Sequence, residues 1–249
     1  NIIDCETDFP FYDIWGSSAD DVYIIGFLSY HYDGTALTLM DSREFNFRVI
    51  SGSDNNNIFL ARHGEIAYYD GSNLTFINQN SGDVQAIWGT SPDNIYSVGR
   101  FWSIMHYDGC CWTFDRFEYN DDRPFYGIWG SSENDIFAVG HNGRIMHFDG
   151  NIWSEMNCCV NEILYGVWGS SSENVYSVGT GGTILHYNGS TWNRMNSGTS
   201  DMLFCIWGCS DSCIYVGGYN EILKYDGAEW KPVYNKGTER IWGSSENDI

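Results

Sequence analysis

The sequence predicts an all-β fold, a β-propeller built from four-stranded antiparallel blades. Three observations lead to this prediction. A phrase close to Ile-Trp-Gly-Ser-Ser-x-x-Asn-Ile-Tyr-x-Val-Gly recurs along the 249 residues. Every copy divides into four short segments separated by turn residues, and no window shows an amphipathic helical period of useful length. Self-similarity at a fixed period of this size is typical of propellers and solenoids.

A Trp-Gly pair anchors each copy of the repeat, except in one degenerate copy that has Ser in place of Trp. The anchors are Trp15, Ser51, Trp88, Trp129, Trp168, Trp207 and Trp242. Successive anchors are 35 to 41 residues apart in the numbering. This spacing matches one propeller blade, whose small sheet has two apolar faces that only neighbouring blades can cover.

The clearest copy predicts four strands, over 164–168, 174–178, 183–187 and 192–195. Each is rich in aromatic and β-branched residues, which suit a half-buried pleated surface. Asn-Gly or Gly-Gly joins the second and third segments in two copies. Asp-Gly or Asn-Gly pairs join the third and fourth, at Asp33, Asp70, Asp108, Asp149, Asn188 and Asp226. Such pairs accept positive φ, as tight hairpins require.

The number of blades is predicted from the two ends of the sequence. Asn1 to Cys5 aligns with the tail of a fourth strand, and Ile249 falls where a second strand begins. We therefore expect a seven-bladed ring with one blade incomplete, in a single domain over residues 1–249 that is part of a longer chain. A six-bladed ring with an overhanging strand pair is the alternative, and an open solenoid is a second alternative.

The Trp-Gly-Ser-Ser phrase resembles the repeats of bacterial extracellular and surface propeller proteins, and the resemblance covers essentially the whole chain. It implies a fold and no particular activity. The Gly-His and Trp-Asp signatures of WD repeats and the Ser-x-Asp-x-Gly-x-x-Trp box of sialidase-type propellers are absent from the sequence. No functional residue of those families can therefore be carried over.

The composition indicates a folded, exported protein. The formal net charge is -21, with twelve Lys and Arg. Such a charge disfavours binding to nucleic acid or to anionic membranes. No apolar stretch is long enough to span a bilayer, so we expect no membrane insertion.

Eight cysteines, an even number, favour an oxidising compartment, and we expect an extracellular or cell-surface location. Cys209 and Cys213 flank one turn and are the favoured disulfide pair. The remaining disulfide candidates are Cys5, Cys110, Cys111, Cys158, Cys159 and Cys205. A metal site at the 205, 209 and 213 spacing is less favoured, because thiols on strands and a turn would not converge.

Most other candidate ligands recur once per blade, which is typical of structural positions. His31, His106, His147 and His186 all precede an aromatic residue and a turn. We interpret them as packing or hydrogen-bonding residues. The acidic turns could bind calcium through oxygen ligands, but none has the spaced Asp loop of a calcium site. We expect no cofactor and regard calcium as a weak alternative.

Three blades break the pattern between their second and third strands by placing aromatic residues where others have turn formers. The candidate binding residues are Phe27, Phe101, Trp102 and Tyr219. They should lie on one rim, together with the blade-connecting segments that contain Tyr126 and Tyr165, because the strands alternate in direction. Aromatic clusters of this kind suit stacking on sugar rings or burial against a protein partner.

The sequence contains no recognisable enzyme motif, neither a nucleophile elbow, nor His-Glu-x-x-His, nor a phosphate-binding glycine loop. We therefore expect a non-catalytic propeller that serves as a protein-interaction or structural assembly module, with a protein partner or further copies of itself. A carbohydrate-binding lectin is the alternative. A fragment of a propeller hydrolase or lyase is less favoured.

Overall fold

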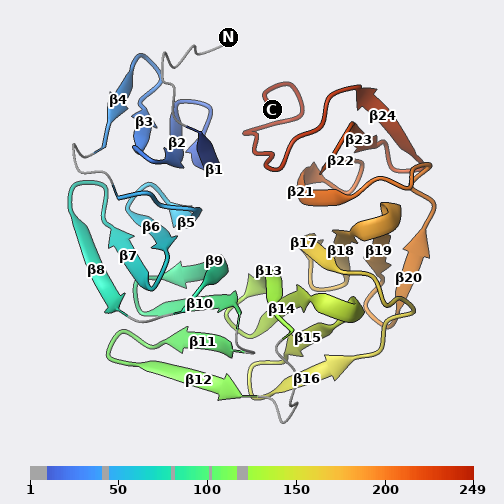
Figure 1. The fold of residues 1–249 in the computed structure, drawn as a ribbon, viewed down its shortest axis with the longest axis horizontal. Helices are drawn as coiled ribbons and strands as arrows, with labels where there is room; N and C mark the ends of the chain where they lie inside the picture. The colour runs from blue at the N-terminus through green and yellow to red at the C-terminus, as the bar shows by residue number, and fades with distance from the viewer. Residues whose placement is uncertain (1–9, 41–44, 80–81, 101–102, 117–122) are drawn as a thin grey trace.

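The computed structural model describes residues 10–40, 45–79, 82–100, 103–116 and 123–249. These residues form six four-stranded antiparallel sheets, which surround a common axis as blades (Figure 1). In each sheet the strands lie in sequence order and are joined to their neighbours by hairpins. Apart from two short 3-10 turns, the regular structure of the described residues is therefore all β, as the four-segment repeat predicts.

The first three blades follow one another along the N-terminal half. Blade 1 contains β1 (Phe11–Ser18), β2 (Asp21–Gly26), β3 (Tyr30–Tyr32) and β4 (Leu37–Leu39). Blade 2 contains β5 (Val49–Asp54), β6 (Asn57–Arg62), β7 (Glu65–Tyr69) and β8 (Leu74–Gln79). Blade 3 contains β9 (Val84–Ser91), β10 (Asn94–Gly99), β11 (Ser103–Tyr107) and β12 (Trp112–Arg116).

The other three blades are the most regular. Blade 4 contains β13 (Phe125–Ser132), β14 (Asp135–Gly140), β15 (Ile145–Phe148) and β16 (Trp153–Met156). Blade 5 contains β17 (Leu164–Ser171), β18 (Asn174–Gly179), β19 (Ile184–Tyr187) and β20 (Trp192–Met195). Blade 6 contains β21 (Leu203–Ser210), β22 (Cys213–Gly218), β23 (Ile222–Tyr225) and β24 (Trp230–Tyr234). Two short 3-10 turns, η1 (His141–Gly143) and η2 (Thr180–Gly182), stand between the second and third strands of blades 4 and 5.

The prediction of seven blades is wrong, because the described residues form six. After β24 the chain continues to Ile249 without forming a sheet, and its only pairing is an isolated bridge between Ser245 and Asp248. This C-terminal segment, residues 235–249, lies between blade 6 and blade 1 (Figure 1). This segment contains the first-strand sequence of a repeat, but among the described residues no strand pairs with it. The other expected contributor, Asn1 to Cys5, lies outside the described residues.

The anchor Trp of one repeat packs against the anchor Gly of the next. A Cβ atom added to Gly130, for example, would lie 2.7 Å from Cη2 of Trp88 in blade 3. Four other pairs show the same contact, Trp15 with Gly52, Trp129 with Gly169, Trp168 with Gly208, and Trp242 with Gly16. The last pair joins the C-terminal segment to blade 1. The repeat therefore needs Gly because a side chain there would collide with the neighbouring indole.

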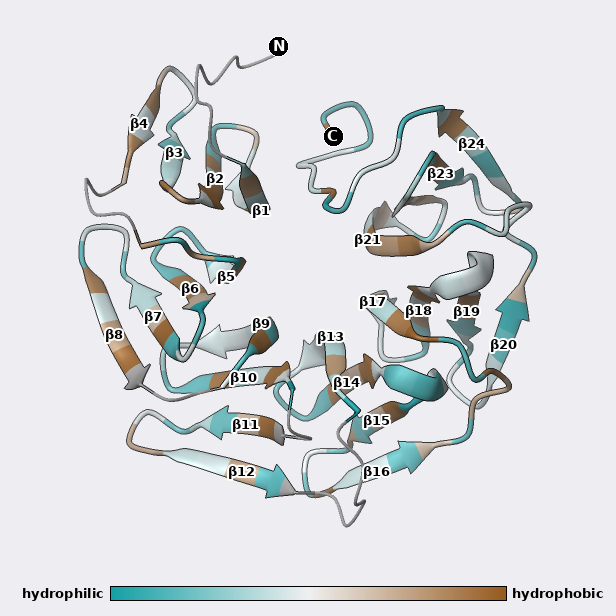
Figure 2. Ribbon diagram, in the orientation of Figure 1, coloured by the Kyte–Doolittle hydropathy of each residue, from teal (hydrophilic) through white to brown (hydrophobic). Residues whose placement is uncertain are grey.

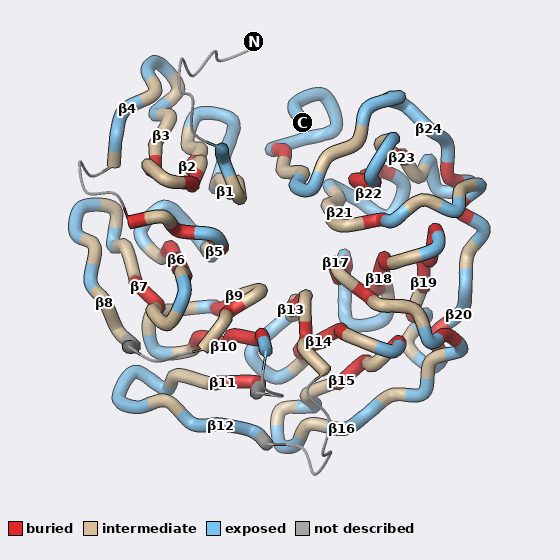
Figure 3. Tube along the Cα trace, in the orientation of Figure 1, coloured by how far each residue is buried: buried red, intermediate tan, exposed pale blue. Residues whose placement is uncertain are grey.

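The hydrophobic core lies between blades rather than at the centre of the ring. Between blades 3 and 4, Tyr96 and Val98 pack with the fully buried Phe125 and Ile136. Buried residues are most frequent in the second strand of each blade, such as β10, β14, β18 and β22 (Figures 2 and 3). Burial of one such side chain stabilises the fold by about 1.5–3 kcal/mol.

The hairpins place all connections on two rims. Turns between strands one and two contact turns between strands three and four; Gly34, for example, lies against Asp20. We call this the turn rim. On the other side, the turns between strands two and three bond to the segments that connect the blades, as when the Tyr219 amide donates to the Met202 carbonyl. We call this the connection rim.

Candidate functional site

Two of the four predicted binding residues, Phe27 and Tyr219, belong to the described part of the chain, and both lie on the connection rim. Tyr219 follows β22 and is 66% exposed. Phe27 follows β2 and is half-buried, and it belongs to blade 1 whereas Tyr219 belongs to blade 6. Phe101 and Trp102 fall outside the described residues. The described residues therefore leave the predicted binding site untested.

A row of three aromatic rings crosses blades 4, 5 and 6 at the connection rim. Tyr126, Tyr165 and Phe204 begin the inner strands β13, β17 and β21, each three residues before its anchor Trp. The ring centroids of Tyr126 and Tyr165 are 5.2 Å apart, edge to face, and those of Tyr165 and Phe204 are 5.8 Å apart. All three side chains are half-buried. We call them the aromatic arc.

The same repeat position holds a cation–aromatic pair on blades 1 and 2. Arg48 precedes β5, and its guanidinium carbon lies 5.4 Å from the ring centroid of Tyr12 in β1. Arg48 is exposed. Burial raises the pKa of the Tyr126 hydroxyl, and the nearby Arg100 guanidinium opposes that shift. The inner edge of this rim thus combines flat aromatic surface with accessible positive charge.

The two rims differ in charge. The turn rim consists of the stretches 18–21, 33–36, 54–57, 70–73, 91–94, 108–111, 132–135, 149–152, 171–174, 188–191, 210–213 and 226–229. All but 188–191 contain Asp or Glu, and none contains Lys or Arg. Cations instead gather at the connection rim, among them Arg48, Arg62, Arg100, Arg123, Arg144 and Arg240. Several of them pair with carboxylates on the same rim, as Arg62 does with Glu65 and Arg100 with Asp83.

The carboxylates of the acidic turns accept hydrogen bonds from the backbone of their own turns. Oδ1 of Asp33 accepts the amide protons of Thr35 and Ala36, at 2.9 and 2.8 Å. These hydrogen bonds lower the pKa of Asp33 to about 2. The following Gly34 adopts φ of 85°, as a hairpin of this kind requires. The carboxylates therefore fix turns and add solvation to this rim.

Each of the recurrent histidines stabilises its own blade. Nε2 of His31 lies 2.6 Å from Oδ1 of Asp21, and His147 bonds to Asp135 in the same way at 2.7 Å. In blades 3 and 5 the partners are the side-chain oxygens of Asn94 and Asn174. Each imidazole stacks on the aromatic residue of strand two, with centroids 4.2–4.5 Å apart. Each histidine therefore makes its hydrogen bond and its stacking contact within its own blade.

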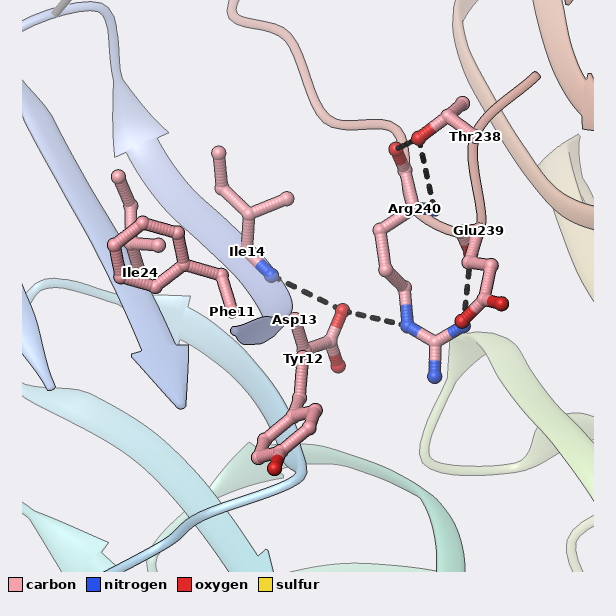
Figure 4. Close-up of a pocket in the computed structure, with 8 residues that line it drawn as sticks. All are labelled: Phe11, Tyr12, Asp13, Ile14, Ile24, Thr238, Glu239 and Arg240. Atoms are coloured by element: carbon pink, nitrogen blue, oxygen red, sulfur yellow. Dashed lines mark hydrogen bonds and ion pairs between the residues drawn. The ribbon is translucent and has the colours of Figure 1, made fainter. Parts of the chain in front are cut away.

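A pocket lies where blade 1 meets the C-terminal segment (Figure 4). Its volume is about 500 Å³. Oδ1 of Asp13 is 3.0 Å from Nε of Arg240, and Oδ2 of Asp13 accepts the amide proton of Ile50 in blade 2 at 3.1 Å. Burial raises the pKa of the Asp13 carboxyl, and Arg240 opposes the shift. Figure 4 shows Phe11 on the side of this pocket away from Arg240.

The cysteines show one bonded pair in the described residues. Cys209 and Cys213 form a disulfide across the turn between β21 and β22. The other five described cysteines, Cys110, Cys111, Cys158, Cys159 and Cys205, are thiols, and Cys5 lies outside the described residues. The thiol of Cys158 donates to the carbonyl of Gly143 at 2.6 Å, as the hydroxyl of Ser197 does to Gly182 at 2.7 Å. Cys158 therefore fills a structural position of the repeat.

The described part of the chain contains neither a cluster of metal ligands nor a membrane-spanning helix. No group of three or more His, Cys, Asp or Glu side chains there could hold a metal ion. Within the same residues, no helix has the length and apolar character needed to cross a bilayer.

Solved structures with the same architecture identify the fold. A structure of the WD40 β-propeller domain of Doa1 superposes with a TM-score of 0.79 at 10% identity, covering 97% of this chain and 88% of that one. The fold is a β-propeller. A structure of YCF48 bound to D1 peptide gives a TM-score of 0.72 at 14% identity, with 98% of this chain and 88% of that one covered. The RRP9 WD40 repeats give a TM-score of 0.77 at 7% identity, over 97% of this chain and 86% of that one.

Sequence comparisons do not assign this propeller to a family. No protein-family model matches the chain, and no curated protein matches it. The resemblance to Trp-Gly-Ser-Ser repeat proteins therefore remains a prediction. At these identities the solved structures establish the propeller fold alone.

The aromatic arc was not among the predicted site residues, although the sequence carries a signal for it. The position three residues before each anchor reads Tyr12, Arg48, Gln85, Tyr126, Tyr165, Phe204 and Glu239. This column is aromatic in four of the seven repeats and polar or charged in the other three. Reading the repeat by columns, rather than by its broken turns, would have found it.

Proposed function

We propose that this propeller is a non-catalytic protein-interaction scaffold that binds its partner on the connection rim, at the aromatic arc. The observation that supports it is the row of contacting rings formed by Tyr126, Tyr165 and Phe204 across three blades. Half-buried aromatic residues with a nearby arginine are the side chains enriched at the energetic centres of protein interfaces. The propeller structures of similar shape include one with a bound peptide.

Charge supports this rim over the other. A partner at the turn rim would have to desolvate or neutralise a continuous set of carboxylates that already bond to their own turns. At the connection rim, rings and arginines lie together, so apolar burial and charge pairing can act at one place. We infer that the turn rim provides solubility and that the connection rim provides recognition.

Self-assembly and carbohydrate binding have less support than binding to a protein partner. A lectin on a repeat scaffold would repeat its stacking residue in each blade, whereas the arc column changes to Arg48 and Gln85 in blades 2 and 3. We therefore propose a protein partner rather than a carbohydrate. The disulfide between Cys209 and Cys213 and the resemblance to exported repeat proteins support an extracellular or surface location.

The test is selection of peptides from a displayed library on the immobilised chain, followed by binding to variants. Tyr165→Ala and Phe204→Ala should each weaken binding of the selected peptides at least about tenfold, since aromatic anchors carry much of an interface's energy. Ile152→Ala is the matched control, because Ile152 is 64% exposed on the turn rim. Peptides that lose affinity with Ile152→Ala but not with Tyr165→Ala would contradict the proposal.

A further inference from the structure

We propose that the turn rim of blade 3 carries a covalent attachment site, where Cys110, beside Cys111, joins this chain by a disulfide to a protein segment that has a cysteine among basic residues. The inference goes beyond the proposed peptide binding at the aromatic arc and concerns the opposite rim. It follows from a comparison of this Cys-Cys pair with the other cysteines of the described chain.

Cys110 and Cys111 stand in the turn between β11 and β12, and both are exposed. Oδ1 of Asp108 accepts the amide protons of both residues, at 2.9 and 2.8 Å, which fixes the backbone of the turn. The equivalent turns of the other five blades hold no cysteine at these two positions. Blade 3 therefore presents two thiols that the hairpin itself does not require.

The second Cys-Cys pair of the chain, Cys158 and Cys159, is arranged differently. Cys158 is half-buried, and its thiol donates to the carbonyl of Gly143 at 2.6 Å. Ser197 holds this position in blade 5 and makes the same bond. Cys158 thus serves the packing of the repeat, and only Cys159 of that pair is exposed. Among the described residues, two adjacent exposed thiols occur in the blade 3 turn alone.

Cys110 and Cys111 are poorly placed to bond to each other. Neighbouring Cα atoms are about 3.8 Å apart across a trans peptide, whereas the Cα atoms of a disulfide are roughly 4.4–6.8 Å apart. Cys209 and Cys213, whose Cα atoms are 5.5 Å apart, do form a disulfide in this chain. An oxidising environment would therefore leave the blade 3 thiols available to a sulfur of another molecule.

The attachment reaction needs a disulfide on the partner and no other oxidant. The Cys110 thiol releases its proton to water, and the thiolate attacks one sulfur of that disulfide. A bond forms between Cys110 and this sulfur, the bond between the two partner sulfurs breaks, and the leaving sulfur, now reduced, takes up a proton. Cys110 is the attacking residue, because Sγ of Cys111 lies 3.8 Å from Oδ2 of Asp108, whose charge raises the pKa of the Cys111 thiol.

The carboxylates around the pair select a basic partner. Asp93 lies against this turn, since a Cβ atom added to Gly109 would be 2.6 Å from its Oδ1. Burial raises the pKa of the Tyr68 hydroxyl, and carboxylates of blades 2 and 3, Asp70 and Asp93, add to the shift. Lys or Arg beside the partner's cysteine would pair with such carboxylates and approach faster. A second copy of the chain would instead bring a rim of like charge.

The experiment compares two short synthetic peptides, each with one cysteine held in a mixed disulfide with a coloured aromatic thiol. Lys flanks the cysteine in one peptide, and Glu flanks it in the other. The release of the coloured thiol gives the rate at low and at high salt, and mass spectrometry of the digested product locates each attachment. We expect the Lys peptide to attach at Cys110 at least about tenfold faster than the Glu peptide at low salt, with a smaller ratio at high salt.

Cys159 is the internal control, because it is exposed but follows β16 on the connection rim. Its preference for the Lys peptide should be at least about threefold smaller than that of Cys110. An equal preference at the two thiols would reduce the effect to the net charge of the chain and overturn the proposal. Cys110→Ser should slow attachment to the blade 3 turn at least about tenfold. Attachment at Cys111 with an undiminished rate would contradict the role given to Cys110.

Asp108→Asn tests the charge while keeping the turn, because Asn188 holds this position in blade 5 and accepts the equivalent two amide protons. The variant should lower the preference of Cys110 for the Lys peptide about threefold, with urea unfolding close to that of the unmodified chain. An unchanged preference in a folded variant would show that the carboxylates do not select the partner.

Two other results would also overturn the proposal. If the attached peptide is released again and leaves the chain two hydrogens lighter, Cys111 has displaced it and the two neighbours bond to each other. If mild oxidation of the chain alone gives a covalent dimer that Cys110→Ser abolishes, the partner is a second copy of the chain.

Discussion

The carboxylate of Asp13 and the guanidinium of Arg240 form an ion pair, with 3.0 Å between Oδ1 and Nε. Each residue stands two positions before an anchor, Trp15 and Trp242 respectively. In blades 4 and 5 that position is Gly127 and Gly166. The pair therefore joins blade 1 to the C-terminal segment at a place where regular blades pack without side chains.

The first prediction concerns this ion pair. Arg240→Gln should lower the free energy of unfolding by about 1–3 kcal/mol at pH 7, because it leaves the buried Asp13 carboxylate with fewer partners. Burial raises the pKa of Asp13 above 3.8 in the folded state. The folded state then binds more protons than the unfolded state just above pH 3.8, so the penalty of the ionised carboxylate grows as pH rises through the folded pKa.

Urea unfolding at pH 7 and near pH 4 tests this prediction. The deficit of Arg240→Gln should shrink as pH falls toward 4, because the raised pKa of Asp13 leaves more of this carboxyl protonated there than an ordinary aspartate would be. The double variant Asp13→Asn/Arg240→Gln should recover much of the loss at pH 7. A deficit of equal size at both pH values would show that Arg240 acts through packing alone.

The second prediction concerns the contact of Trp88 with Gly130. Gly130→Ala places a methyl group 2.7 Å from the indole, so the two blades must separate or the ring must move. We expect a loss of about 1–3 kcal/mol in urea unfolding. Ser154→Ala, an exposed change in the same blade, should cost much less. If Trp88→Leu does not reduce the cost of Gly130→Ala, the indole is not the cause.

The third prediction concerns acid sensitivity. Burial lowers the pKa of His106 and His186 below the ordinary 6.5. The folded state therefore holds the neutral imidazoles, and their contribution to stability is complete above pH 6.5 and is lost as pH falls below it. NMR titration should give both histidines pKa values below 6.5, with unfolding free energy falling from pH 7 to pH 5. A pKa above 6.5 for either would refute the assignment.

The fourth prediction uses the thiol of Cys205 as a reporter of the C-terminal segment. Burial raises the pKa of this thiol to about 12, and Arg240 lies near it. In the native protein Cys110, Cys111 and Cys159, which are exposed, should react with a thiol reagent well before Cys205. Trp242→Ala removes the indole that lies against Gly16 and should bring Cys205 into the fast class by mass spectrometry. Unchanged protection of Cys205 would mean that the segment stays in place without its Trp.

The strands and turns follow from local sequence, and the blade number does not. Asn-Gly and Asp-Gly pairs fix hairpins within a few residues, and the Trp-Gly anchor fixes the inner strand of every blade, even where Ser51 replaces Trp. Whether a seventh sheet forms depends on pairing between segments far apart in the chain. Counting repeats cannot establish such pairing, because the copy at Trp242 has the first-strand sequence without the sheet.

The candidate site was likewise predictable from the sequence only in part. Tyr126 and Tyr165 were placed on the correct rim, because the strand direction alternates from a known anchor. Their contact with each other and with Phe204 depends on how three blades pack side by side, which no single repeat contains. The pairing of Asp13 with Arg240 spans nearly the whole chain and had no signal in either segment.

The most direct test of the protein-binding account is a hydrogen-exchange map of the chain with and without a peptide selected on it. The account predicts added protection at the starts of β13, β17 and β21, where Tyr126, Tyr165 and Phe204 stand, and no change in the Asp-Gly turns of the opposite rim. Protection confined to the turn rim, with the arc unchanged, would contradict it.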